Sequence, residues 1–261
     1  NRFGKQLYKV FFEDYIEKLW GKHPSQIDTH VGIQYIKGQS VATVIRENDK
    51  NIDDPAFYYP KLGAGQMWEC AARKFEEMGG VIHTNCTVLK LNRENSKVKS
   101  LTCVMDGEPI EVETDIVIST MPIKDLINSM ADVPANIIDI ASHLCYRDMV
   151  LVSLLVPKLN INVDAASKTL GNIIPDTWIY IQDKRRKLAR VQVYNNWSPY
   201  LVEDPENTVW IGCEFYCEEG DDDWNRSEEE WVRFAKQEMS FLHLISSSTP
   251  VFESHRECVK K

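Results

Sequence analysis

The chain has 261 residues, of which 43% are hydrophobic and 26% are charged, and its formal net charge is −9. This length allows one large domain or two smaller ones with buried cores, and the composition is typical of globular proteins. The excess of acidic residues repels polyanions on average, so we expect no binding of nucleic acid. No run of apolar residues is long enough to predict a transmembrane helix.

Cysteine usage argues against both a metal centre and a disulfide framework. The 7 Cys residues are scattered, and the pair Cys213 and Cys217 lacks the second pair of ligands that a zinc site requires. Most of them lie among apolar neighbours, where a free Cys behaves as a small core residue in a reducing compartment. We therefore expect a cytoplasmic protein without a bound metal.

The first part of the chain is predicted to be helical. Residues 3–20 place apolar side chains at helical spacing, and Pro24 suits the first turn of a short helix. A second amphipathic stretch covers residues 29–45 and is followed by a polar linker over residues 47–55.

Residues 66–130 alternate between helical and strand patterns. In chain order, we predict a helix over 66–78, strands over 81–83 and 87–92, a hairpin of 100–104 with 110–113, a buried strand over 115–122 and a helix over 123–130. This order is typical of the later part of a doubly wound nucleotide-binding domain.

The remainder of the chain is rich in strand patterns. The predicted strands cover residues 150–156, 178–182, 190–194 and 209–216, and they favour an antiparallel sheet with one exposed face. A helix over residues 227–242 follows, because Ser227 and Glu230 have the spacing of a capping box.

Aromatic residues are the main candidates for a binding site, because motifs of hydrolases, P-loop enzymes and zinc proteases are absent. Trp178 and Tyr180 alternate on one predicted strand, and Asn195–Asn196–Trp197 follows the next strand. Aromatic faces beside amide groups suit a planar ring, a nucleobase or a sugar. The same aromatic residues can also simply fill the core under a sheet.

Five regions of the chain carry motifs that occur together in one known family. They are Phe3–Pro24 with Tyr15, Trp20 and Gly21; Tyr59–Glu69 with Gly63 and Gly65; Gly79–Leu91 with Gly80, Asn85 and Val88; Asp115–Pro122; and Trp178–Ile181 together with Asn195–Pro199. In this order they resemble the UDP-galactopyranose mutases and their oxidase-like relatives among the FAD-binding oxidoreductases. The family's Gly-x-Gly-x-x-Gly loop and its last flavin motif have no counterpart here. We therefore expect this chain to be an interior piece of a longer flavoprotein.

The resemblance implies FAD as the cofactor. It implies a mixed α/β fold of the α+β class, in which part of a Rossmann-like FAD-binding domain is combined with an antiparallel β-sheet substrate domain with helices. By this division, residues 1–56 form a helical substrate-side segment, 57–145 belong to the FAD-binding domain and 146–261 form the sheet domain. The implied FAD contacts are Val88, Ser119, Thr120 and Met121. Without the pyrophosphate loop, we expect the piece alone to bind FAD weakly and to be inactive.

The resemblance also implies where a small-molecule substrate binds. The implied residues are Tyr15, Trp20, Tyr59, Trp178, Tyr180, Asn195 and Trp197, with Arg190 offering its charge to a phosphate. No catalytic side chain is assigned, because the flavin itself carries the chemistry in this family. The implied function is to interconvert the pyranose and furanose forms of a UDP-sugar for cell-surface polysaccharide, including lipopolysaccharide, synthesis.

Two departures from the mutase pattern leave other functions open. Leu19 stands where the mutases have Gln, and Ile36–Ser40 replaces their Arg-rich segment, leaving Lys37 or Arg46 to bind a diphosphate there. An FAD-dependent oxidation of the amine oxidase or protoporphyrinogen oxidase type is the first alternative. A noncatalytic binding module lined by aromatic residues is the second.

Overall fold

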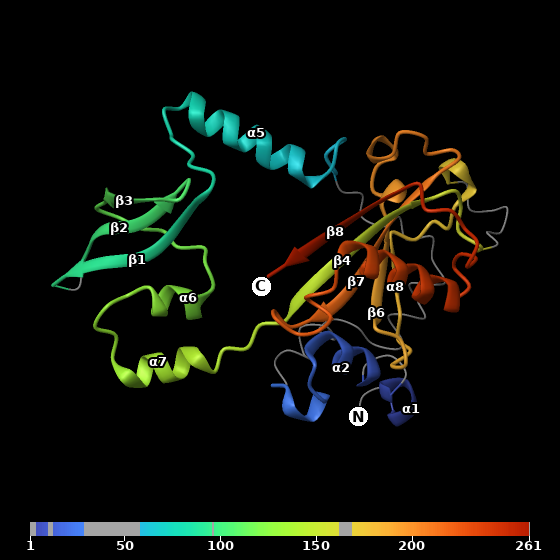
Figure 1. Ribbon diagram of the computed structural model, residues 1–261, viewed down its shortest axis with the longest axis horizontal. Coiled ribbons are helices and arrows are strands. Elements are labelled where there is room, and N and C mark those ends of the chain that lie inside the picture. The colour runs from blue at the N-terminus through green and yellow to red at the C-terminus, as the bar shows by residue number, and fades with distance from the viewer. Residues whose placement is uncertain (1–3, 10–12, 29–57, 96, 162–168, 261) are drawn as a thin grey trace. The chain divides into compact units, whose positions relative to one another are not determined.

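The computed structural model describes residues 4–9, 13–28, 58–95, 97–161 and 169–260, which form two compact units (Figure 1). One unit combines the chain up to Met67 with Arg147–Lys260, and the other consists of Trp68–Tyr146. The amphipathic stretch predicted over 29–45, the following linker, Lys37 and Arg46 lie outside the described residues.

The first unit is built on a five-stranded antiparallel sheet with the strand order β5-β6-β7-β4-β8. The strands are β4 (Asp148–Val156), β5 (Trp178–Tyr180), β6 (Leu188–Val193), β7 (Val209–Cys217) and β8 (Glu253–Val259). Alternation along β4 buries Val150, Val152 and Leu154 on one face, each with 0% exposure. The antiparallel sheet predicted from the sequence is confirmed.

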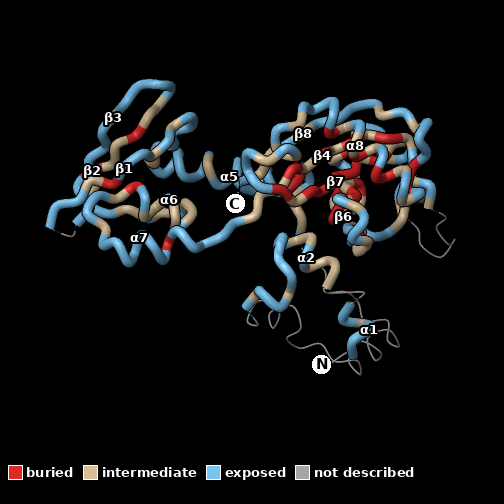
Figure 2. Tube along the Cα trace, turned by 60° about the horizontal axis from the view of Figure 1, so that its bottom comes forward, coloured by how far each residue is buried: buried red, intermediate tan, exposed pale blue. Residues whose placement is uncertain are grey.

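Helix α8 (Glu228–Phe241) covers the buried face of this sheet. Its Trp231, Ala235 and Met239 recur every four residues and are fully buried against the strands. The predicted capping box is present, because the Glu230 amide donates to Ser227 Oγ (3.2 Å) and the Ser227 amide donates to Glu230 Oε2 (2.9 Å). Figure 2 shows buried positions concentrated in β4, β6, β7 and α8, where the core of the unit lies.

The N-terminal elements of this unit are α1 (Lys5–Tyr8), α2 (Asp14–Trp20) and the 3-10 turn η2 (Pro24–Gln26). Helix α2 contacts β6 and β7, and Lys18 anchors it there. The Lys18 ammonium donates to the carbonyl oxygens of Ile181 (2.6 Å), Asp183 (3.0 Å) and Leu188 (2.9 Å). Burial lowers the pKa of Lys18 to about 8, while the charge of Asp183 opposes that fall. The three bonds tie α2 to the connection between β5 and β6.

The second unit contains a three-stranded antiparallel meander and short helices. Its elements are most of α5 (Ala64–Glu77), then β1 (Cys86–Glu94), β2 (Lys97–Met105), β3 (Glu108–Glu113), α6 (Ile123–Asn128) and α7 (Ala135–Ser142). The predicted hairpin turn is confirmed, since Asp106 (φ 50°) and Gly107 (φ 88°) both adopt the left-handed backbone that a two-residue turn needs.

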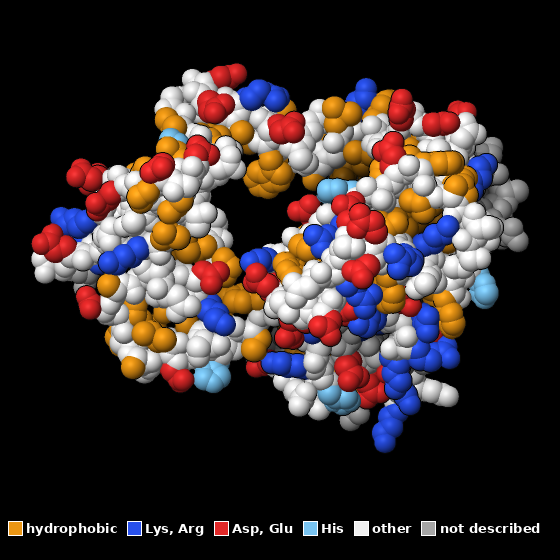
Figure 3. Space-filling view, viewed as in Figure 1, with side chains coloured by type: hydrophobic (Ala, Val, Ile, Leu, Met, Phe, Trp, Pro, Cys, Tyr) orange, Lys and Arg blue, Asp and Glu red, His pale blue; other side chains and the backbone are white. Residues whose placement is uncertain are grey.

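Two predicted strands in this unit are wrong. Residues 81–83 and 115–122 are irregular, and no described strand pairs with either segment. Val81 is 70% exposed, Ile116 80% and Ile118 89%, so apolar side chains lie at the surface of this unit (Figure 3). The apolar pattern is present in both segments, but a strand forms only where a neighbouring strand supplies hydrogen bonds. Among the described residues, no strand supplies them to either segment.

The mixed α+β class is confirmed, with helices and antiparallel sheets in both units. The three-part division of the chain stays a prediction, since it assigns functional parts that the architecture alone does not test. Among the described residues, no helix has the length and apolar character needed to cross a membrane.

The core of the first unit makes Trp231 a sensitive position. Its ring lies 4.8 Å from that of Phe215 and 5.8 Å from that of Phe234. We expect Trp231→Ala to lower the free energy of unfolding by about 3–5 kcal/mol, because the substitution leaves a cavity. Urea unfolding measures this, with the half-exposed Phe252→Ala as control, expected to cost less than about 1 kcal/mol. Equal losses in the two variants would contradict the assignment of the core.

The anchor of α2 gives a second prediction. We expect Lys18→Met to lower the free energy of unfolding by about 2 kcal/mol, because three part-buried carbonyl groups lose a charged donor. Lys184→Met is the matched control, since Lys184 is 66% exposed and lies 3.9 Å from Asp14, and it should cost less than about 1 kcal/mol. Chemical denaturation of both variants provides the comparison, and a Lys18 variant as stable as the control would refute the anchor.

Candidate functional site

The sheet face opposite α8 collects polar and aromatic side chains, and we call it the aromatic face. The register pairs Trp178 with Gln192, Tyr180 with Arg190, and Gln192 with Gly212, so their side chains share one side of the sheet. Its members on the strands are Trp178 and Tyr180 of β5, Arg190 and Gln192 of β6, Gly212, Glu214 and Tyr216 of β7, and Leu151 and Ser153 of β4.

A continuous row of contacts crosses this face. The Tyr15 ring of α2 lies 5.5 Å from that of Tyr180, and the Arg190 guanidinium lies 5.8 Å from the Tyr180 ring and 4.8 Å from the Trp178 ring. Trp178 then contacts Trp197 at 5.2 Å, and Trp197 contacts Tyr59 at 5.2 Å. The structure therefore brings together six of the eight residues predicted to bind substrate, from segments that lie far apart in the sequence.

Arg190 is held by a carboxylate that has no exposure to solvent. Arg190 donates from Nε to Glu214 Oε2 at 2.9 Å, its Nη2 forms an ion pair with the same oxygen at 2.9 Å, and Gln192 donates from Nε2 to Glu214 Oε1 at 2.5 Å. Burial alone would lower the pKa of Arg190, but the hydrogen bonds and charge of Glu214 outweigh it and raise that pKa. The guanidinium is thus charged and fixed in direction.

A second polar pair lies further along the same face. Tyr194 follows β6 in the 3-10 turn η4 (Tyr194–Asn196), and its hydroxyl lies 3.5 Å from Ser153 Oγ. A Cβ atom on Gly212 would lie 2.4 Å from the Tyr194 hydroxyl, so the absence of a side chain at Gly212 makes room for this ring.

The loop Asn195–Ser198 fastens neighbouring segments through its polar side chains. Asn195 donates to the Thr208 carbonyl (2.9 Å) and accepts from the Trp210 amide (3.0 Å). Asn196 donates to the carbonyl oxygens of Ile174 (2.6 Å) and Asp176 (2.8 Å), and Ser198 Oγ donates to that of Lys61 (2.7 Å). Asn195 is therefore placed to support the loop, since its amide is buried and occupied by the backbone.

Trp20 stands apart from the row. It closes α2, is 39% exposed and takes part in none of the ring contacts given above for the described residues. Sequence reasoning also missed Lys18 and Glu214. A charged residue at the centre of the apolar strand Val209–Cys217 was the available signal for Glu214, because such a group must be paired.

The residues predicted to contact FAD lie in the second unit. Val88 sits in β1 next to a register irregularity between Val88 and Lys90, which releases part of the backbone from the ladder. Ser119, Thr120 and Met121 lie in the irregular segment before α6. The Ser119 hydroxyl is buried and has no hydrogen-bond partner among the described residues, so it is available to a bound group.

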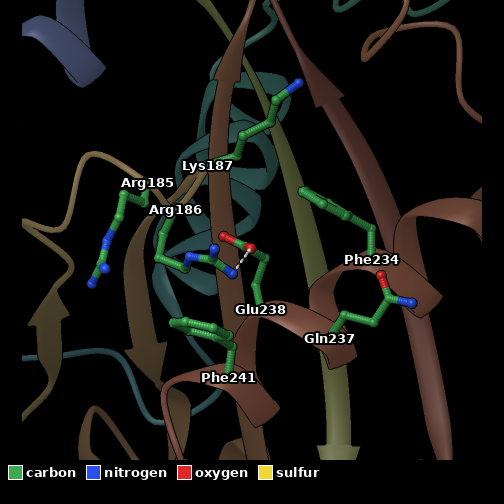
Figure 4. Close-up of a pocket in the computed structure, with 7 residues that line it drawn as sticks. All are labelled: Arg185, Arg186, Lys187, Phe234, Gln237, Glu238 and Phe241. Atoms are coloured by element: carbon green, nitrogen blue, oxygen red, sulfur yellow. Dashed lines mark hydrogen bonds and ion pairs between the residues drawn. The ribbon is translucent and has the colours of Figure 1, made fainter.

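A cavity beside α8 is a structural junction rather than a candidate site (Figure 4). Its lining includes Arg186, which pairs with Glu238 (3.1 Å) and lies 3.7 Å from the Phe241 ring. Glu238 also accepts from the Leu188 amide (3.1 Å), and the neighbouring Lys187 pairs with Asp223. These charges are satisfied within the chain, where they join the start of β6 to α8.

Comparison with protein-family models gives no match, and comparison with curated proteins gives none either. Among solved structures, the chain is similar to a reduced UDP-galactopyranose mutase, with a TM-score of 0.74 and 16% identity over 100% of this chain and 54% of the mutase chain. The chain therefore spans about half the length of that mutase.

Two further solved structures are similar over a smaller part of the chain. A protein described as a protoporphyrinogen oxidase, from Exiguobacterium sp. 255-15, has a TM-score of 0.52 at 12% identity over 74% of this chain and 38% of its own. An oxidoreductase from Methanosarcina mazei has a TM-score of 0.52 at 14% identity over 74% of this chain and 42% of its own. The resemblance predicted from the sequence is thereby confirmed at the level of fold: this chain has the fold of the UDP-galactopyranose mutases and of related oxidoreductases.

Proposed function

We propose that the chain belongs to an FAD-dependent enzyme, in which the aromatic face binds the substrate and residues near Val88 and Ser119 contact the cofactor. The observation that carries the proposal is the row from Tyr15 through Arg190 and Trp197 to Tyr59. Rings joined to a fixed guanidinium suit a ligand with a planar or sugar ring and polar substituents.

The second unit offers groups that fit a flavin nucleotide. The unpartnered Ser119 hydroxyl can donate to a polar atom of the cofactor, and the backbone beside Val88 can bind an adenine edge without a particular side chain. FAD, when bound, supplies the redox or nucleophilic chemistry of the reaction. The chain's own residues then bind and orient the substrate and exclude water.

The more specific proposal is a nucleotide-sugar mutase acting on a UDP-sugar. It is supported by the likeness to a UDP-galactopyranose mutase over the entire chain, whereas the likeness to the two oxidoreductases covers 74% of it. An interconversion of pyranose and furanose forms for cell-surface polysaccharide would follow, in the cytoplasm, where nucleotide sugars serve as substrates.

The second candidate is an FAD-dependent oxidation of a neutral or amine substrate. One observation favours it: the charge of Arg190 is neutralised by the buried Glu214, so this face offers little attraction to a diphosphate.

The flavin proposal predicts a coloured protein. We expect the purified full-length protein to contain stoichiometric FAD, visible as the absorption of an oxidised flavin and released by denaturation. Ser119→Ala should lower FAD occupancy, because it removes only the buried hydroxyl, and Ser142→Ala at an exposed position of α7 is the matched control. A colourless protein that does not bind added FAD would contradict both FAD-dependent functions and leave only the noncatalytic binding module.

The aromatic row predicts how substrate binding responds to mutation. We expect Trp178→Ala to weaken binding of UDP-galactopyranose to the reduced full-length protein by about tenfold or more, because the row loses its central ring. Tyr200→Ala, at an aromatic residue that is 60% exposed and outside the row, should leave binding unchanged. Titration calorimetry provides the measurement.

The same titration separates the two candidate functions. Wild-type protein that contains FAD but shows no binding of UDP-galactopyranose at millimolar concentration would contradict the mutase and leave the oxidation standing. Equal effects of the two substitutions would contradict the aromatic face as the substrate site.

A further inference from the structure

We propose that the Arg190–Glu214 pair receives an uncharged, hydroxyl-bearing part of the substrate, and that Glu214 keeps Arg190 from serving as a phosphate-binding residue. The proposal rests on the aromatic face being the substrate site. It assigns Arg190 a role different from the phosphate contact that the sequence resemblance implies.

Glu214 cannot itself contact a ligand. Its side chain has 0% exposure, Oε2 accepts one hydrogen bond from Arg190 Nε and forms an ion pair with Nη2, and Oε1 accepts one bond from Gln192. All of its influence on a ligand therefore passes through Arg190, which makes it a positioning residue.

Arg190 keeps both hydrogen-bonding capacity and access to a ligand. A guanidinium has five N–H groups, and Glu214 and the Tyr180 hydroxyl engage only some of them, so the guanidinium keeps donors for another partner. The Arg190 side chain is 23% exposed, and the Trp178 ring lies 4.8 Å from its guanidinium. A ligand oxygen can thus accept from Arg190 while its ring packs against Trp178.

The charges on this face do not suit a diphosphate. Arg190 is the one Lys or Arg that the described strands β4 to β8 direct to this side, since Arg256 faces the α8 side, where it donates to the Arg226 carbonyl. The same side carries Glu214, Glu253 and Glu257. Lys18 approaches from α2, but its ammonium is bound by three carbonyl groups. The strands therefore present one neutralised cation among three carboxylates, and a polyanion gains little there.

A neutral polyol matches what the face does offer. Its remaining polar groups are uncharged side chains that both donate and accept, namely Gln192, Ser153 and Tyr194, and aromatic rings border them. Such groups bond to sugar hydroxyls and pack on a sugar ring without any net charge.

Replacing Glu214 by Gln tests the proposal, because it removes the neutralising charge and keeps the shape. The full-length protein is titrated with inorganic pyrophosphate and, separately, with methyl β-galactopyranoside. We expect Glu214→Gln to bind pyrophosphate about tenfold more tightly than wild type, since Arg190 loses its countercharge. We expect binding of the glycoside to weaken several-fold, since Arg190 is less well positioned. Opposite changes for the two probes would not arise from a general loss of structure.

Glu257→Gln is the matched control. Glu257 lies on the same face at the edge strand β8, and its side chain is 59% exposed beside His255. Removing its charge should change neither binding constant by more than about twofold. Weaker pyrophosphate binding in Glu214→Gln, or no change for either probe, would overturn the proposal.

A double variant keeps the test decisive if Glu214→Gln does not fold. Arg190→Gln with Glu214→Gln removes both charges of the pair, and thermal unfolding monitors its stability. The proposal expects pyrophosphate affinity equal to that of wild type, and a clear loss would show that Arg190 already binds anions. Flavin content, measured in the same samples, reports on the proposed FAD-dependent function independently of this result.

Discussion

A carboxylate that is shut off from water must be surrounded by hydrogen-bond donors, and meeting that requirement at Glu214 organises one face of the sheet. Arg190 and Gln192, two residues apart on β6, both turn toward it. The contacts with Glu214 fix the Arg190 guanidinium between β6 and β7, where Trp178 and Tyr180 of β5 lie beside it. The polar centre and the aromatic border of the face are thus consequences of one buried charge.

The face of the sheet that packs against α8 is formed by a simple apolar pattern, and for this reason it was easier to predict from the sequence. Apolar residues at every second position of β4 and at every fourth position of α8 are signals that a sequence carries locally. The same holds for the box at Ser227 and Glu230 and for the turn at Asp106 and Gly107, since each depends on neighbours only a few residues away. These elements were predicted correctly for that reason.

The site depends on contacts that local patterns do not encode. Alternation identified Trp178 and Tyr180, but their contacts with Tyr15 and, through Trp197, with Tyr59 arise only in the folded unit. Lys18 carries no local signal of its role, because its three carbonyl partners come together only in the folded unit. The strand predicted over Asp115–Pro122 is wrong for the opposite reason. Its apolar pattern is strong, but strand formation depends on a partner strand outside the pattern. Asn195 was recognised as important, yet its partners are backbone groups.

In the loop Asn195–Ser198, the polar side chains and the aromatic ring have different kinds of partner. Its three polar side chains, on either side of Trp197, hold three other stretches of chain through main-chain atoms, which do not change when side chains are exchanged. The indole of Trp197, by contrast, contacts the rings of Tyr59 and Trp178. The bonds that hold the loop thus come from side chains other than the aromatic ring, so a substitution at Trp197 leaves the donors and acceptors of those bonds unchanged.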